Sequence, residues 1–177
     1  VQFLSWEKFS DWMDEDGFSI LMQQGKFDYV ISVEYPERSK NLKNCLLHMK
    51  ELTKPKGHLL LGMNNRLGAR FLCGDRDPYT DGVMDGVEGY LHVTDAKETI
   101  GRCYSKSELK SSFMEAGMER VQFFSVLSDL KNPVFLYADG YFPNEDISTR
   151  VFPTYRYPRS VFMEEACLHK TFVKEGI

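Results

Sequence analysis

Two short polar segments carry side chains suited to chemistry, Glu34-Tyr35 and Asn64-Asn65-Arg66. Each follows a run of apolar residues, 29–33 or 58–63, whose composition predicts a buried strand. In parallel α/β sheets, ligands bind in the crevice at the carboxyl ends of the strands. At that edge the Glu34 carboxylate could take a proton from a substrate, while the amides and the guanidinium could hold hydroxyls or a phosphate.

A structural role stays open for both segments. Glu34 could simply cap the loop that leads into Pro36. Asn64 and Asn65 could instead form a turn, because asparagine tolerates left-handed backbone and hydrogen-bonds to its own main chain.

Residues 64–100 form a long segment that is rich in glycine and aspartate and has few periodic apolar positions. The segment is longer than an ordinary connection between a strand and a helix, and loops of this length usually have a function. We expect it to cover the carboxyl end of the sheet as a lid over a hydroxyl-rich acceptor. Its carboxylates and aromatic ring suit such a ligand. Asp85 is a second candidate base, and three further residues are candidates for substrate binding: Arg70, Glu88 and Tyr90.

Residues 77–88 place carboxylates at positions 1, 5, 9 and 12 and a glycine at position 6, as in a calcium-binding EF-hand loop. Position 3 is Tyr79, however, which is not a usual ligand, and the flanks lack the two amphipathic helices of that motif. We therefore predict no metal site. The four histidines show no spacing typical of metal ligands or of a catalytic triad.

The elements that would position these residues begin with the strand over 29–33. Residues 41–54 follow with apolar side chains at spacings of three and four, which predicts a helix. The proline and glycine in 55–57 end that helix before the next strand. Strand, helix and strand in this order predict a βαβ unit with parallel strands.

Downstream, Ser105 and Glu108 form a capping box that predicts a helix ending at Gly117. Residues 118–126 and 132–137 then predict a pair of strands. Two units follow from this pattern. They are a partial α/β domain over 1–145, which contains the 64–100 insertion, and an extended tail over 146–177 that is rich in proline and aromatic residues.

The order of these elements resembles the second half of class I S-adenosylmethionine (AdoMet) methyltransferases. Residues 27–32 are similar to the family's fourth strand, 52–61 to the approach to its fifth strand, and 104–117 to the helix before its sixth. More specific similarity is to methyltransferase-like domains of bacterial glycosyltransferases and surface-polysaccharide biosynthesis proteins. It lies in four segments: 64–74, 85–90, 105–109 and 137–139.

This resemblance implies a Rossmann-like, mostly parallel sheet with an antiparallel final strand and a long insertion after the fifth strand. It also implies S-adenosylmethionine as the methyl donor and a glycosyl or polysaccharide-precursor acceptor, with a glycosyltransferase domain in the same protein as a possible partner. Val33, Glu34 and Tyr35 would line the methionine end of the cofactor pocket. Trp6 would either stack on the adenine or anchor a helix expected over 7–13, which the acidic residues and glycine that follow would end.

The glycine-rich cofactor loop of that family is not found in this sequence, because no G-x-G-x-G follows a predicted strand. In such loops only glycine lets the backbone approach the cofactor closely. We therefore expect this chain alone to bind AdoMet weakly or not at all, with the loop supplied by an upstream segment. The alternative is a non-catalytic interaction module that keeps the fold and ties a glycosyltransferase to its assembly.

Composition argues against several classes of protein. The 22 Lys and Arg against 26 Asp and Glu give a formal charge of -4, which does not favour a nucleic-acid partner. No run approaches the roughly 18 apolar residues of a membrane span. The four widely spaced cysteines form no C-x-x-C pair, which is typical of a cytoplasmic protein with reduced thiols.

Overall fold

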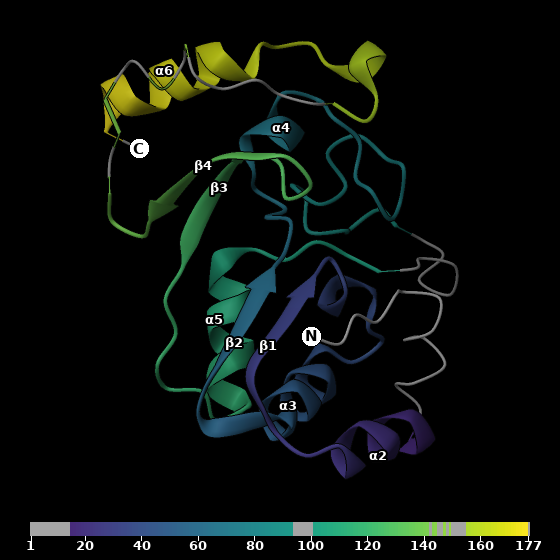
Figure 1. Cartoon of the computed structure of the whole chain (residues 1–177). Helices are drawn as coiled ribbons and strands as arrows, with labels where there is room; N and C mark the ends of the chain where they lie inside the picture. Colours follow the sequence, from purple (N-terminus) through teal and green to yellow (C-terminus); the bar gives the residue numbers. More distant parts are fainter. Residues whose placement is uncertain are drawn as a thin grey trace.

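The computed structural model describes residues 15–93, 101–141 and 155–176, together with Pro143, Asn144, Ile147 and Thr149. This part of the chain has a mixed α/β fold with one parallel and one antiparallel pair of strands (Figure 1). The elements are, in order, α2 (Glu15–Gln23), β1 (Phe27–Val33), η1 (Pro36–Arg38), α3 (Leu42–Leu52), β2 (Thr53–Gly62), α4 (Ala69–Leu72), α5 (Lys106–Glu115), β3 (Phe124–Ser128), β4 (Pro133–Ala138), η3 (Pro158–Ser160) and α6 (Glu165–Glu175).

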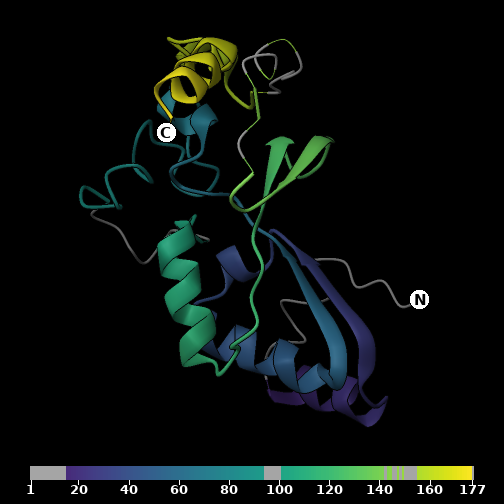
Figure 2. The same ribbon diagram turned by 90° about the vertical axis from the view of Figure 1, so that its left-hand side faces the viewer.

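The predicted βαβ unit is confirmed. β1 and β2 are adjacent and parallel, with Val30 opposite Leu59 and Val33 opposite Gly62. α3 connects them and covers one face of the sheet, and α5 lies on the same side (Figure 2). The carboxyl ends of both strands therefore meet at one edge of the sheet.

The start of β2 differs from the prediction. α3 ends at Leu52 and the strand begins at once, at Thr53, so the helix ends two residues earlier than expected. The pairing shifts where residues 54–57 bulge out, since Phe27 pairs with Thr53 but Tyr29 pairs with His58. A Cβ at Gly57 would lie 2.7 Å from the Asp28 carbonyl oxygen, so only glycine fits this close approach.

The core lies between α3 and α5. Leu42 and Leu46 of α3 pack against Phe113 and Ala116, and Leu46 is fully buried. The capping box at the start of α5 is confirmed, because the Ser105 hydroxyl accepts from the Glu108 N–H while the Glu108 carboxylate accepts from the Ser105 N–H. The cap and the packed stripe together place this helix against α3.

No described helix covers the opposite face of the parallel pair, which is called the bare face below. Tyr29, Ile31 and Val33 of β1 are 62%, 68% and 53% exposed, and Leu60 of β2 is 50% exposed. Because side chains alternate along a strand, these residues share the face that α3 does not cover. Parallel sheets are normally covered on both faces, so this apolar surface is unusual for the class.

The N-terminal boundary and the strand pair also correct the sequence interpretation. α2 begins at Glu15, within the segment that was expected to end a helix. Residues 1–14 lie outside the described chain. β3 begins only at Phe124, six residues later than predicted. It pairs with β4 in antiparallel register as expected, but the two strands form a sheet of their own and do not extend the parallel pair, so a single, mostly parallel sheet is not seen.

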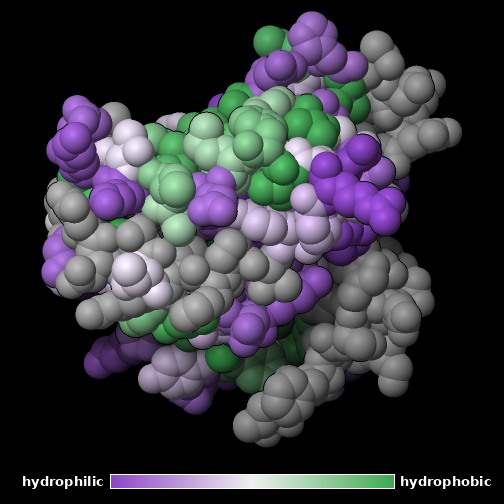
Figure 3. Space-filling model, turned by 90° about the horizontal axis from the view of Figure 1, so that it is seen from above, coloured by the Kyte–Doolittle hydropathy of each residue, from purple (hydrophilic) through white to green (hydrophobic). Residues whose placement is uncertain are grey.

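The C-terminal segment was predicted to be extended, which is wrong for its last third. Residues 165–175 form α6, which packs on α4 and ends at Gly176 in a left-handed conformation. The segment before it docks at Gly74, where the absence of a side chain lets the Ser160 carbonyl oxygen and the Phe162 ring come close. Seen from above, the molecule is hydrophobic in the middle of this face and hydrophilic toward its edges (Figure 3). Phe162 contributes exposed apolar surface.

The two faces of the sheet should respond differently to truncation. We expect Leu46→Ala to lower the free energy of unfolding by about 2–5 kcal/mol, because it opens a cavity in the core. Ile31→Ala, on the bare face, should cost less than about 1 kcal/mol. Urea denaturation followed by circular dichroism measures both. A loss at Ile31 as large as that at Leu46 would show that the outer face is covered in this chain.

Candidate functional site

The site lies at the carboxyl ends of β1 and β2, where β1 leads into η1 and β2 leads into residues 64–93 (Figure 1). Glu34 directly follows β1 with a φ of 57°, and its N–H donates to the Gly62 carbonyl oxygen at 2.8 Å. This left-handed residue turns the chain away from the sheet and leaves the Glu34 side chain at its edge. Val33 precedes it with an exposed side chain on the bare face.

The turn between β3 and β4 reaches the same edge. Lys131 in this turn lies 3.7 Å from the Glu34 carboxylate, and the Asp129 carboxylate lies 3.9 Å from the Arg70 guanidinium. A Cβ at Gly62 would be 3.4 Å from the Leu130 side chain. Arg70 and Glu34, both predicted site residues, therefore contact the same turn.

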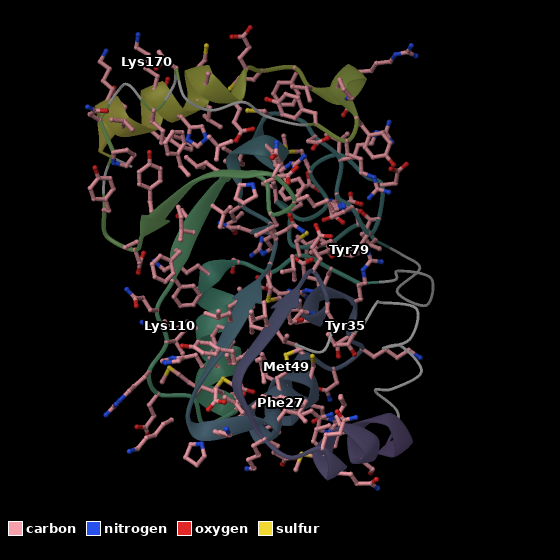
Figure 4. The ribbon with its side chains drawn as sticks, viewed as in Figure 1. Phe27, Tyr35, Met49, Tyr79, Lys110 and Lys170 are labelled. Atoms are coloured by element: carbon pink, nitrogen blue, oxygen red, sulfur yellow. The ribbon has the colours of Figure 1, made fainter. Side chains whose placement is uncertain are left out.

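Glu37 is the most deeply buried charged side chain at this edge, and it was not among the predicted site residues. It is fully buried in η1 and accepts hydrogen bonds from the Asn64 N–H, the Asn64 side-chain amide and the Tyr79 hydroxyl. Its carbonyl oxygen accepts from the Arg102 N–H at 2.8 Å. Tyr79 lies beyond the strand ends in Figure 4, at the opposite end of β1 from Phe27. The residue was missed because a single Glu after Pro36 carries no signal of burial.

Burial raises the pKa of Glu37 to about 7, because the charged form loses its solvation. The hydrogen bonds from Tyr79 and Asn64 favour the carboxylate and oppose this shift only in part, and the nearby charge of Glu34 adds to it. Burial and the Glu37 charge also raise the pKa of Tyr79, which therefore stays a hydrogen-bond donor. A carboxyl group with a pKa near neutrality can exchange a proton at physiological pH.

A second buried carboxylate organises the loop next to this site. Asp77 accepts from the N–H groups of Tyr79 and Thr80 and from the Tyr90 hydroxyl, the last at 2.7 Å. The Tyr90 hydroxyl in turn accepts from the Cys103 N–H at 2.7 Å. Burial raises the pKa of Tyr90, and the buried thiol of Cys103 and Asp77 add to that effect. Asp77 and Tyr90 thus join residues 77–90 to Cys103, which precedes the β-bridge between Tyr104 and Asn65.

Arg66 has protein partners for its guanidinium. Its Nε donates to the Glu108 carboxylate at 2.8 Å and its Nη1 to the Gly86 carbonyl oxygen at 2.9 Å. Burial of Glu108 opposes its ionisation, but the Ser105 and Arg66 hydrogen bonds and the Arg102 charge lower its pKa to about 2. Arg66 therefore holds the 64–90 segment to the N-terminus of α5.

Arg70 is also engaged, with a carboxylate that is almost fully buried. Its Nε and Nη2 donate to one oxygen of Asp75 at 3.0 Å and 2.8 Å. Asp75 is 1% exposed and also accepts from the N–H groups of Arg76, Arg156 and Tyr157. This carboxylate joins the insertion to the C-terminal segment.

The remaining predicted residues occupy different surroundings. Tyr35 begins η1 as a half-buried residue, and burial with the nearby thiol of Cys45 raises its pKa. The Asn65 side chain caps a turn by accepting from the Leu67 N–H, which is the alternative role considered for it. Glu88 is exposed and lies 3.7 Å from His92. The Asp85 carboxylate packs against Gly82, and Trp6 lies outside the described residues.

The segment resembling an EF-hand loop lacks the motif's helices, because α4 ends at Leu72 and turns follow residue 84. Asp77 uses its oxygens as hydrogen-bond acceptors within the loop. Among the described residues, no three histidine, cysteine or acidic side chains are grouped so that they could hold a metal ion. All four cysteines are free, and Cys167 alone is exposed. In the same part of the chain, no helix is long and apolar enough to cross a membrane.

An open groove of about 420 Å³ lies along α5, between Arg102, Tyr104 and Ser111. The Arg102 guanidinium lies 4.6 Å from the centre of the Tyr104 ring and also contacts the Glu108 carboxylate.

Comparison of the chain with protein-family models, with curated proteins and with solved structures gave no match. Function therefore has to be argued from the residues at the strand ends.

The raised pKa of Glu37 predicts a specific pH dependence of stability. Between its ordinary value of 4.5 and about 7 the folded state holds a proton that the unfolded state releases, so stability falls as the pH rises through this window. The shift corresponds to roughly 3 kcal/mol at most. Glu37→Gln should remove this component and gain stability relative to the wild type between pH 5 and 8.

Urea titrations across that pH range provide the measurement, and Glu115→Gln on the exposed side of α5 is the matched control. In the control, the free energy of unfolding should change with pH as it does in the wild type. If Glu37→Gln shows the same pH dependence, Glu37 is not protonated in the folded protein at pH 5.

Proposed function

We propose that this chain is the acceptor-side part of an AdoMet-dependent methyltransferase-like domain with a Rossmann-like sheet, and that it acts on a glycosyl or polysaccharide-precursor acceptor. The observation that carries the proposal is the parallel β1–α3–β2 unit, whose strand ends bring Glu34, Asn64 and the buried Glu37 together. Ligands of parallel α/β folds bind at this edge. The resemblance in residues 64–74 and 85–90 adds the reaction class.

The sheet itself supports a larger assembly. The exposed apolar side chains of Tyr29, Ile31, Val33 and Leu60 support this proposal, because parallel sheets are normally covered on both faces. In the proposed domain, the glycine-rich cofactor loop would come from a segment upstream of Val1. Val33, Glu34 and Tyr35 would then border the methionine end of AdoMet.

The proposed mechanism depends mainly on positioning. AdoMet, when bound, would supply the methyl group to an acceptor oxygen or nitrogen, and a carboxylate of this chain would take the proton that the acceptor releases. Holding donor and acceptor in line supplies much of the acceleration, and the base only takes the proton. Glu34 is the first candidate base because its carboxylate is at the edge and its partner Lys131 is exposed, and Asp85 is the second.

In this scheme Glu37 is a positioning residue. It touches Asn64 and Tyr79 and is closed off from solvent, so it would set the orientation of the strand-end amide. Arg66, Arg70 and Tyr90 would serve by holding the 64–93 segment in place as a lid. Asn65 and Glu88 have exposed side chains and could meet the acceptor.

A non-catalytic interaction module is the second candidate function. The bare apolar face of the sheet favours it, because contiguous exposed apolar surface commonly marks a contact site. Such a module would keep the fold, and neither the 177-residue chain nor a longer polypeptide that contains it would bind AdoMet.

Isothermal titration calorimetry with AdoMet separates the two candidates. We expect the 177-residue chain to show no tight binding, since the glycine loop makes the main contacts to the cofactor in such domains. The polypeptide from the complete reading frame should bind AdoMet in the micromolar range. Absence of binding to both would support the module, and micromolar binding to the 177 residues alone would mean that the pocket is built differently.

In the active full-length protein, Glu34→Gln should lower kcat for methyl transfer by about 10²-fold or more if Glu34 is the base. Because Glu34 would also border AdoMet, the rates are compared at saturating AdoMet. Asp28→Asn is the matched control, because Asp28 is an exposed carboxylate near the other end of β1. Methyl transfer from radiolabelled AdoMet gives the rates, and a wild-type kcat for Glu34→Gln would exclude Glu34 from proton transfer.

A further inference from the structure

The C-terminal segment and the insertion together form a basic groove apart from the strand ends. The groove has a volume of about 530 Å³ and its charged lining consists of Arg76, Arg156, Arg159 and Asp81. Three guanidinium groups face one carboxylate there, in a chain whose formal charge is -4. The groove is thus a local concentration of positive charge on an acidic protein.

The walls of the groove are held by buried Asp75. One oxygen of this carboxylate accepts from the N–H groups of Arg76 and Tyr157 at 3.1 Å each, and the other accepts from the Arg156 N–H at 3.4 Å. Arg70 completes the set from below. Because one buried side chain binds the main chain of both walls, it fixes the positions of Arg76 and Arg156 relative to each other.

The aromatic ring of Tyr157 orients two of the guanidinium groups. Those of Arg76 and Arg156 lie 5.5 Å and 5.4 Å from the ring centre, as in cation–π contacts. The Arg76 guanidinium also forms an ion pair with the Asp81 carboxylate at 3.5 Å. The Arg156 guanidinium donates to the Pro78 carbonyl oxygen at 3.2 Å.

The charges in the groove are only partly balanced. Among the described residues, no carboxylate forms an ion pair with the guanidinium of Arg156 or Arg159, although Arg156 donates to the Pro78 carbonyl oxygen. Arg159 belongs to the short η3 turn, where Ser160 folds back on the Tyr157 carbonyl oxygen. Both guanidinium groups are exposed and are not neutralised by a carboxylate, so N–H donors of each stay available to a ligand.

We propose that this groove binds the diphosphate group of a small ligand. Arginine presents its N–H donors in a planar fork that matches phosphate oxygens, and several such forks are suited to a group with several negative charges. The volume is in the range of small-molecule sites rather than of a nucleic-acid surface. Arg66, the strand-end residue that was expected to bind phosphate, instead donates to the Glu108 carboxylate. Arg156 and Arg159 in the groove are therefore the better candidates for binding phosphate.

The test is calorimetric titration of the 177-residue chain with inorganic pyrophosphate, in the absence of AdoMet. We expect saturable binding with one site per chain. Arg159→Ala should weaken it at least fivefold, and Arg156→Ala combined with Arg159→Ala at least twentyfold. Arg120→Ala removes the same charge from an exposed loop elsewhere and should stay within twofold of the wild type.

Arg159→Lys distinguishes fork recognition from simple charge, since it keeps the charge and should still weaken binding by at least threefold. Because Arg159 is exposed, its substitution should leave the thermal melting curve unchanged, so a loss of binding can be assigned to the groove. A nucleoside diphosphate sugar tests the source of the group. Tighter binding than pyrophosphate supports a nucleotide-linked ligand, and equal binding supports recognition of the diphosphate alone.

Three outcomes would overturn the proposal. They are no saturable binding of pyrophosphate, an equal loss in Arg120→Ala, or tighter binding of an acidic peptide than of pyrophosphate. None of these depends on methyl transfer, so the groove and the proposed reaction can fail separately.

Discussion

The burial of the Glu37 carboxylate is the constraint that determines how the strand-end region is built. A buried carboxylate is costly unless its oxygens are hydrogen-bonded. Asn64 at the end of β2 and Tyr79 in the insertion both donate to it, and its main chain holds Arg102. η1, β2, the insertion and the return toward α5 therefore meet at one residue. Any rearrangement of the insertion would expose or unpair this carboxylate.

Asp75 has the same function on the far side of the insertion. It collects the Arg70 guanidinium and three main-chain N–H groups, one from the insertion and two from the C-terminal segment. Glu37 joins the insertion to the sheet, and Asp75 joins the C-terminal segment to the insertion. Both the strand-end site and the basic groove are held in place by groups that themselves face away from solvent.

The parallel strand pair gives these features a common direction. Its inner face is filled by the core around Leu46, while its outer face exposes Ile31 and its neighbours. An edge rich in polar groups thus lies next to an apolar face that the described residues leave exposed. This holds for the proposed methyltransferase and for an interaction module, and it explains why cofactor binding, rather than the fold of these residues, separates the two.

Local sequence signals were enough to predict the βαβ unit, the capped α5 and the antiparallel β3–β4 pair, because periodicity and capping act over a few neighbouring residues. They failed for β2, whose start depends on a bulge opposite Phe27, and for α6, which packs on α4. The sequence also indicated that polar residues gather at the strand ends. Only the tertiary structure decided their partners: Arg66 turned to Glu108, Arg70 to Asp75, and the unremarked Glu37 to Asn64. The reason is physical, since a charge pairs with whatever burial brings within reach, and that partner can be 27 or 42 residues away in the chain.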